Sequence, residues 1–422
     1  MVAGALAFAI GGAGLPAVLA LDSETFDDYK GVGAAEDARR QPAPLNADGH
    51  SIEPSLSWKL LDVLTPHVFA AQTLGYSDNV FHQRTVGTHS PYSRTAVGGR
   101  GDICLEDHVF SVGVRAAEGL YFKADRNSEY LETIADARLD LNWNAFRAHA
   151  DGAYERIYFP AALQLGGQFA REQVYRGEAW AEATWNRVGG KVGLSFRKDD
   201  FESTGANLAL ASADHITIGF DVQANVKVTE KITALVEYDF EAVRFDKDLN
   251  RDYDAHQVRA GINGTLGAKL ALSIKFGYTY QQVHLSTGNF VDRDRYRGFN
   301  AAAALSWQAL PQLTFSFTYR RDLTWSIGNN FTTIDSVSAG AVYRFGPAEK
   351  LSASGDISFA HSETSGPGSY DVFATGLGFG WKIFKWLDAT AFYRYSQGMG
   401  SGRQTANEYD EHRVGVSLAV GF

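Results

Sequence analysis

The last eleven residues, His412-Arg-Val-Gly-Val-Ser-Leu-Ala-Val-Gly-Phe422, carry the pattern that decides the fold. Apolar side chains occupy every second position from Val414 to Phe422, and the positions between them hold small or polar residues. A period of two places the two sets on opposite faces of an extended strand, whereas a helix needs a period of about 3.6 residues. The stretch therefore predicts a β-strand with one apolar face, and the chain ends on an aromatic residue of that face.

Earlier stretches repeat this alternation. Apolar residues again take every second position in Leu387–Tyr395 and in Leu270–Tyr280. In Glu132–Trp143 the set opposite the apolar side chains includes charged residues such as Asp136 and Arg138. A soluble β-sandwich is an alternative for the last strand, but a sheet with such a polar face needs water on that face.

The connections between the predicted strands alternate in length. We expect short connections near 144–146, 186–188, 227–229, 266–268, 309–311, 346–348 and 384–386, and long ones near 160–171, 200–211, 247–252, 286–293, 326–331, 364–367 and 400–407. The first four strands are expected at 64–80, 107–114, 120–125 and 132–143, with a long loop over Phe81–Glu106 and a turn at Ala116–Gly119. This pattern predicts an all-β fold, a transmembrane antiparallel up-and-down β-barrel of about 18 strands.

Composition agrees with a barrel and excludes other classes. The chain has 422 residues, of which 45% are hydrophobic and 13% aromatic, and a formal net charge of -10. A negative chain without a basic stripe is not expected to bind nucleic acid. Cys104 is the single cysteine, so an intramolecular disulfide or a cysteine-based metal site is excluded.

An apolar run from Val2 to Leu21 precedes the strands and contains the small-residue pattern Val18-Leu19-Ala20. This pattern is typical of a secretory signal peptide cleaved after Ala20, although no Lys or Arg precedes the run. A retained transmembrane helix is the alternative. We expect a signal peptide over residues 1–20, a flexible periplasmic segment over 21–60 and the barrel over 61–422.

Aromatic residues stand at the expected strand ends, as the two membrane interfaces require. Strands expected to descend end in Trp143, Trp185, Trp307, Phe345 and Phe422. Tyrosines lie toward the opposite ends of rising strands, at Tyr278, Tyr280, Tyr319, Tyr393 and Tyr395.

With the apolar face against lipid, the opposite face lines the lumen. The charged residues expected on it are Asp136, Arg138, Asp140, Lys191, Arg197, Asp221, Glu237, Asp239, Glu241, Arg259, Lys275, Arg320, Arg344, Asp388, Arg394 and Arg413. Ionised side chains at membrane depth face water or one another, so the pattern predicts a hydrated interior. The alternative role of each residue is an ion pair that braces the wall.

No catalytic motif emerges from the chain, and we expect neither enzymatic activity nor a cofactor. A P-loop, a dinucleotide-binding glycine pattern and HExxH are all missing from the sequence. His215 stands in the lumen phase of its strand without a convincing catalytic partner. The stretch Asp246–Asp254 alternates oxygen-bearing residues like a calcium loop, but it lacks the glycine and the closing glutamate, which favours a solvated loop.

Residues Pro66 to Phe81, with the segment Tyr76-Ser-Asp-Asn-Val-Phe81, resemble the first strand of the beta-barrel porin 2 family. The resemblance extends from about residue 60 to the end of the chain. The last strand, which ends on Phe422, resembles the closing strand of bacterial outer-membrane barrels, where it serves as an assembly signal. These resemblances imply a location in the outer membrane, with lipid, lipopolysaccharide and the barrel-assembly machinery as partners.

Three functions are compatible with this pattern. Some barrels similar to the family belong to exopolysaccharide or capsule export systems, so the resemblance implies first a polysaccharide conduit with periplasmic export components as partners. A diffusion porin predicts a long loop folded into the lumen, for which Phe81–Glu106 is the candidate. A structural or adhesion barrel predicts a lumen closed by ion pairs. Inner-face glycines such as Gly376, Gly378 and Gly380 are expected to leave space for conduction.

Overall fold

The computed structural model describes residues 64–80, 88–123, 129–160, 169–202, 214–246, 252–284, 295–326, 329–346, 350–364, 368–401 and 408–421. The predicted signal peptide, the predicted flexible segment and Phe422 lie outside these ranges. Within the described ranges, no helix is long and apolar enough to cross a membrane.

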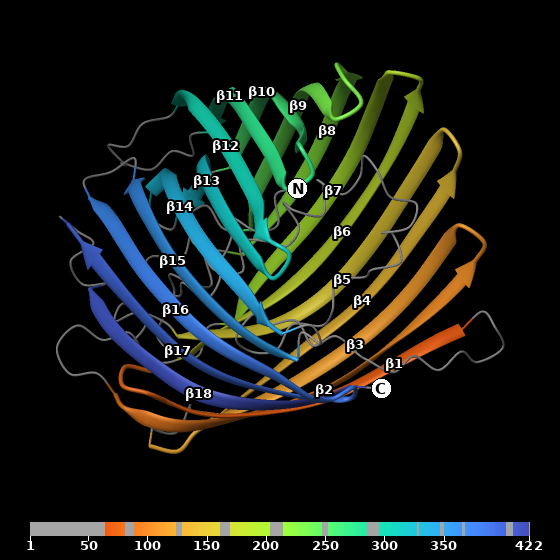
Figure 1. Cartoon of the computed structure of the whole chain (residues 1–422). Helices are drawn as coiled ribbons and strands as arrows, with labels where there is room; N and C mark the ends of the chain where they lie inside the picture. Colours follow the sequence, from red (N-terminus) through yellow and green to blue (C-terminus); the bar gives the residue numbers. More distant parts are fainter. Residues whose placement is uncertain are drawn as a thin grey trace.

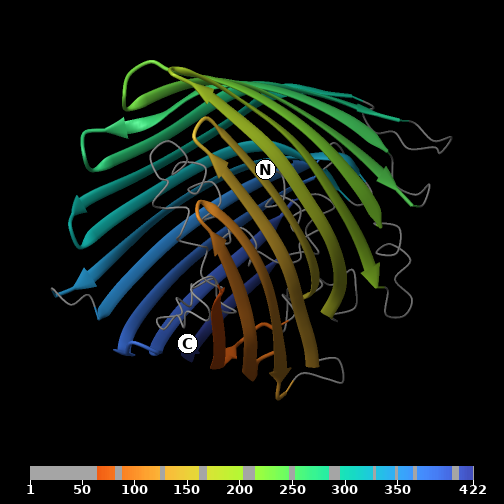
Figure 2. The same ribbon diagram turned by 90° about the vertical axis from the view of Figure 1, so that its right-hand side faces the viewer.

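Eighteen antiparallel strands form one closed barrel, which confirms the predicted fold class. The strands are β1 (Leu64–Ser77), β2 (Ser90–Leu105), β3 (His108–Tyr121), β4 (Glu129–Trp143), β5 (Phe146–Pro160), β6 (Phe169–Trp185), β7 (Val188–Glu202), β8 (His215–Lys227), β9 (Ile232–Phe245), β10 (Tyr253–Leu266), β11 (Leu270–Val283), β12 (Arg295–Leu310), β13 (Leu313–Ser326), β14 (Asn329–Phe345), β15 (Leu351–Thr364), β16 (Ser369–Phe384), β17 (Leu387–Gly400) and β18 (Tyr409–Gly421). Each strand pairs with its neighbours in sequence, and β1 also pairs with β18, so the sheet has no free edge. Figures 1 and 2 show the strands wrapping around a common axis, with β8–β10 on the wall opposite β17, β18, β1 and β2.

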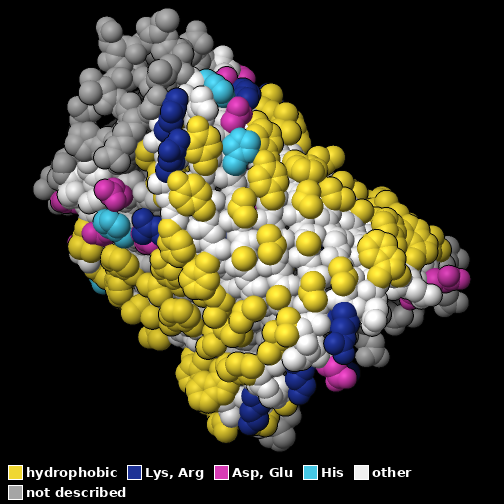
Figure 3. Space-filling view, turned by 90° about the horizontal axis from the view of Figure 1, so that it is seen from above, with side chains coloured by type: hydrophobic (Ala, Val, Ile, Leu, Met, Phe, Trp, Pro, Cys, Tyr) yellow, Lys and Arg dark blue, Asp and Glu magenta, His cyan; other side chains and the backbone are white. Residues whose placement is uncertain are grey.

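The two-residue period separates an outer from an inner face, as β18 illustrates. Val414, Val416 and Leu418 are 50%, 55% and 52% exposed, whereas Ser417 and Ala419 between and after them are buried. Apolar side chains cover most of the described outer surface in Figure 3, and charged side chains gather toward its margins. Exposed apolar surface on this scale marks a face that meets an apolar environment rather than water.

The two ends of the barrel differ in their connections. Short turns at 106–107, 144–145, 186–187, 228–231, 267–269, 311–312, 346–350 and 385–386 join strands at one end, which we call the short-turn end. The opposite end carries the other connections and is called the long-loop end. Left-handed backbone conformations at Glu106, Asn186, Gly267 and Gly346 make the tight reversals of direction at the short-turn end. The chain enters β1 and leaves β18 at this same end.

Two expectations near the start of the barrel are wrong. Residues 90–105 form β2 instead of belonging to a long loop, and the expected turn at Ala116–Gly119 lies inside β3. The glycines of β2 resemble loop residues in sequence, but a strand glycine also makes room for a neighbour: a Cβ at Gly98 would stand 2.5 Å from the ring of Phe69. The expected strand number agrees because one strand is missed and another is divided in two.

Inner-face glycines elsewhere accommodate side chains that lie flat along the wall. A Cβ at Gly376 would stand 2.6 Å from an Asp356 carboxylate oxygen, and one at Gly380 would stand 2.7 Å from the Ser352 hydroxyl. The expectation that these two glycines leave open space is therefore wrong in detail, because side chains of β15 fill the space.

Aromatic residues stand at the short-turn end where the sequence places them. Trp143, Trp185 and Trp307 are 49%, 67% and 47% exposed and lie at or near the ends of β4, β6 and β12. Trp143 packs on Phe146 of the next strand across the turn, with ring centroids 5.4 Å apart. Amphipathic rings at this height suit a membrane interface.

Candidate functional site

By register, all sixteen charged residues predicted to line the lumen stand on the inner face of the barrel. They lie on β4 (Asp136, Arg138, Asp140), β7 (Lys191, Arg197), β8 (Asp221), β9 (Glu237, Asp239, Glu241), β10 (Arg259), β11 (Lys275), β13 (Arg320), β14 (Arg344), β17 (Asp388, Arg394) and β18 (Arg413). Their part in a solute path stays a prediction. Their contacts, described next, show what the inner face is made of.

A first network joins β4 and β5. Arg138 Nε donates to Asp140 Oδ2 at 2.6 Å, on the same strand. The ring of His149 lies between two carboxylates, with Nδ1 2.8 Å from Asp140 and Nε2 3.1 Å from Asp151. Arg138 and His149 are therefore both held by acidic side chains, Arg138 by Asp140 and His149 by Asp140 and Asp151.

The indole of Trp180 on β6 connects this network to β7. Trp180 stacks on the His149 ring, with centroids 5.3 Å apart and planes 18° apart. The ammonium of Lys191 lies 4.8 Å from the centroid of the Trp180 ring. On β5 and β6, Arg147 Nη2 donates to Glu182 Oε2 at 2.6 Å.

A second network, on β6, β7 and β8, is buried. Arg197 donates to Asp199 at 2.6 Å and lies 3.6 Å from Glu172. His215 Nε2 lies 3.4 Å from the other oxygen of Asp199, and neither Asp199 nor His215 is exposed. Because each charge is engaged by its neighbours, His215 reads as a structural member of this network and not as a catalytic base.

A third network centres on Glu237 of β9. Lys275 Nζ donates to Glu237 Oε2 at 2.9 Å, and Arg259 forms an ion pair with the other carboxylate oxygen. Arg259 also donates to Asp239 at 3.0 Å. Two basic residues on β10 and β11 therefore share two acids on β9.

A fourth network closes the seam between β18 and β1. The Ser77 hydroxyl donates to Glu411 at 2.7 Å, and Arg413 donates to the same carboxylate oxygen at 2.8 Å. The connection that follows β1 is fastened to the same strand. Asp78 accepts from the His412 amide at 2.7 Å, and the Asn79 side chain donates to the carbonyl oxygen of Asp410 at 2.8 Å.

Val80, which follows the residues bonded to β18, points into the barrel. Val80 is 1% exposed and packs in one cluster with the inner-face side chains Tyr92, Tyr121 and Phe392. Its amide donates to the Thr88 carbonyl oxygen at 2.9 Å, which closes the root of the connection. Val80 directly precedes Phe81–Glu106, the segment predicted to fold into the lumen. Most of that segment is β2 instead, and residues 81–87 lie outside the described ranges, so the inward fold stays a prediction.

Sequence reasoning misses several members of these networks. His149, Asp151, Asp199, Asp322 and Glu411 were not among the predicted residues, yet each takes part in an inner-face ion pair. A local signal exists for some of them, because residues two apart on a strand share a face. With both residues inside one described strand, the pattern Arg-x-Asp occurs at 100–102, 138–140, 197–199 and 320–322, and in each case the two side chains pair.

The candidate calcium loop shows other uses for its acids. Asp254 accepts from Arg244 at 2.6 Å and lies 2.8 Å from His284 Nε2, and Asp252 accepts from the Phe245 amide. Among the residues that the structure describes, no group of three His, Cys, Asp or Glu side chains is arranged to hold a metal ion. Residues 247–251 of this stretch lie outside the described ranges.

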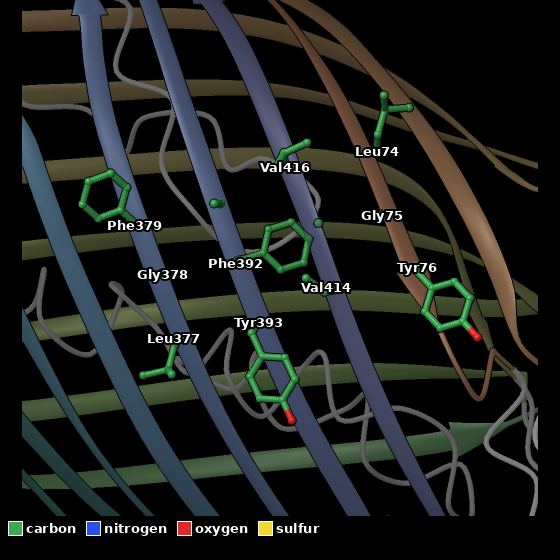
Figure 4. A pocket seen from close by; sticks show the side chains of 12 residues that line it. Leu74, Gly75, Tyr76, Leu377, Gly378, Phe379, Phe392, Tyr393, Val414 and Val416 are labelled. Carbon is green, nitrogen blue, oxygen red and sulfur yellow. The ribbon is translucent and has the colours of Figure 1, made fainter.

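A shallow apolar groove of about 480 Å³ crosses β16, β17, β18 and β1 (Figure 4). Leu74, Leu377 and Val416 line it with other apolar or aromatic residues, and glycines such as Gly378 form part of its floor. Its exposed side chains belong to the outer face, so the groove is separate from the inner networks.

A closed eighteen-stranded barrel with an apolar outer face and an ion-paired inner face defines a porin-like outer-membrane barrel. The chain belongs to the family described as Putative beta-barrel porin 2, whose model matches residues 63–422. This confirms the family suggested by the first strand. Proteins of this class are channels, and channels are not enzymes.

Solved structures agree with the fold. OpdK of Pseudomonas aeruginosa, determined with vanillate, shares 10% identity, covers 85% of this chain and 99% of its own, and superposes with a TM-score of 0.50. OccK2 (OpdF) of the same organism, in complex with glucuronate, shares 12% identity over 86% of this chain and 99% of its own, also with a TM-score of 0.50. No curated protein matches the chain. At these identities the likeness shows the fold.

Proposed function

We propose that the protein is a diffusion channel of the bacterial outer membrane that passes small hydrophilic solutes. The inner face carries this proposal. The side chains of Arg138 and Arg320 remain 34% and 23% exposed although each is paired with an aspartate two residues away. Charged groups at membrane depth need water or a partner, and a barrel of this strand number is too wide for its own side chains to fill. A water-filled passage satisfies both conditions.

The inward turn at Val80 favours a diffusion channel over a polysaccharide conduit. Val80 packs against inner-face aromatic residues near the long-loop end, so the connection after β1 adds a side chain to the inside of the wall there. A narrowed mouth discriminates among small solutes, whereas a continuous polymer needs an unobstructed path. Export of polysaccharide, the first function that the resemblance implied, becomes the alternative.

The solved barrels indicate which solutes to test first. OpdK was determined with vanillate and OccK2 with glucuronate, and both ligands are small carboxylates with a ring. Because those proteins share only the fold with this chain, their ligands serve here as a choice of probe.

Planar bilayer recordings test the function. We expect purified protein to produce stepwise ion conductance, and we expect Arg320→Glu with Arg344→Glu to shift the reversal potential toward cation preference. Protein that inserts and folds but conducts no ions would instead support a structural barrel. Loss of surface polysaccharide on gene deletion, with solute uptake unchanged, would move the assignment to export.

A further inference from the structure

Lys191 differs from the arginines of the four inner networks and from Lys275. In the four inner networks, each arginine and Lys275 contact at least one carboxylate. The Lys191 ammonium instead lies over the ring of Trp180, 4.8 Å from its centroid. Within the part of the chain that the structure describes, no carboxylate lies within ion-pair distance of it.

The carboxylates nearest in the sheet are already engaged. Glu182 is directly opposite Lys191 in the register of β6 and β7, but its oxygen accepts from Arg147 at 2.6 Å, on the side away from β7. Further along the wall, Asp140 and Asp151 hold His149 between them. The acids on this side therefore leave the lysine charge without a counter-ion.

On the other side of Lys191, the neighbouring strand β8 carries one acidic residue that could compete with a solute carboxylate for the lysine. Lys191 is opposite the neutral Gln223 of β8. Asp221, two residues further along β8, is opposite Gly193, and its carboxylate lies against that glycine. Asp221 is therefore the acid whose removal should strengthen the positive potential at Lys191.

We infer that Lys191 and Trp180 form a binding subsite for the carboxylate of a small ring-bearing solute. An ammonium without a counter-ion gains a charge-assisted hydrogen bond when a carboxylate arrives. The Trp180 ring already stacks on His149 and lies under Lys191, so it offers its edge to the body of the solute, an arrangement in which aromatic rings also pack. This inference rests on the proposed function, because the subsite is useful only to a solute that enters the barrel.

Benzoate and acetate are suitable probes in bilayer recordings with potassium chloride. We expect benzoate to reduce the ion current at lower concentration than acetate, and benzylammonium to produce no such block. Lys191→Gln should raise the half-blocking concentration of benzoate about tenfold, the loss of one charge-assisted hydrogen bond. Trp180→Leu should weaken block by benzoate more than block by acetate, and Asp221→Asn should strengthen both.

Lys198→Gln is the matched control. Lys198 lies on the same strand but on the outer face, paired with Asp200 at 2.9 Å, so its removal should leave block unchanged. If benzoate blocks wild type and Lys191→Gln equally, the subsite inference is wrong. The ion conductance of both proteins would still support the proposed channel function. For a barrel that does not conduct, benzoate-dependent tryptophan fluorescence in detergent decides the subsite separately: a response lost in Lys191→Gln supports it, and a response retained there overturns it.

Discussion

Removing the charge of Glu237 tests how strongly the barrel depends on its inner ion pairs. Glu237 is 6% exposed and holds Lys275 at 2.9 Å while it also pairs with Arg259. In Glu237→Gln, Arg259 keeps Asp239 at 3.0 Å, whereas Lys275 loses its described carboxylate. Breaking a buried pair by removing one partner costs about 3–5 kcal/mol, and because Arg259 retains an acid we expect the lower end, about 3 kcal/mol.

A double variant separates the stability lost because Lys275 has no partner from the stability lost because the side chain at 237 changes shape. Glu237→Gln with Lys275→Met removes the uncompensated ammonium together with the acid, so we expect it to recover about 2 kcal/mol of the loss. The free energy of unfolding is measured by urea titration of the barrel folded in bilayers or micelles, followed by tryptophan fluorescence and gel mobility. A cost below about 1 kcal/mol for Glu237→Gln would refute the reasoning, because it equals that of a solvent-exposed pair.

Three further predictions concern the outer face and the first connection. Phe276, 56% exposed at the middle of β11, should lose about 2–4 kcal/mol of unfolding free energy when changed to Arg, measured by the same titration. In a Cys104→Ser background, a membrane-impermeant thiol reagent should label cysteine at Lys275 more readily than at Ile274; the reverse order would mean that the faces are inverted. Asn79→Ala removes the 2.8 Å bond to β18 and should increase single-channel conductance or its fluctuation as Val80 leaves the lumen; unchanged traces would show that this bond does not position Val80.

The faces of the strands could be predicted from the sequence because a strand's side chains alternate without reference to its neighbours. Val414 to Leu418 and the tryptophans at strand ends show this directly. The same local rule identifies pairs two residues apart, such as Arg138 and Asp140, although the sequence analysis did not use it. Information of this kind is contained within one strand.

Contacts between strands could not be predicted in the same way, because they depend on register and on the shape of the wall. Nothing local to Gly98 indicates that the ring of Phe69 occupies the space above it, so β2 resembles a loop. The pairing of Glu237 with Lys275 joins residues on two strands separated by a third, and the inward turn of Val80 depends on fastening to β18. Each of these requires the assembled barrel.

Because β1 pairs with β18, the barrel can close only after the last strand has formed. The Thr73 hydroxyl meets the Ser417 hydroxyl at 3.1 Å across 344 residues of sequence, so the first strand waits for the last before its open edge is covered. Contacts of such separation form slowly, and an unpaired edge can associate with other chains in the interval. Until the last strand has been synthesised and delivered, a nascent barrel of this kind therefore keeps one edge of its first strand unpaired.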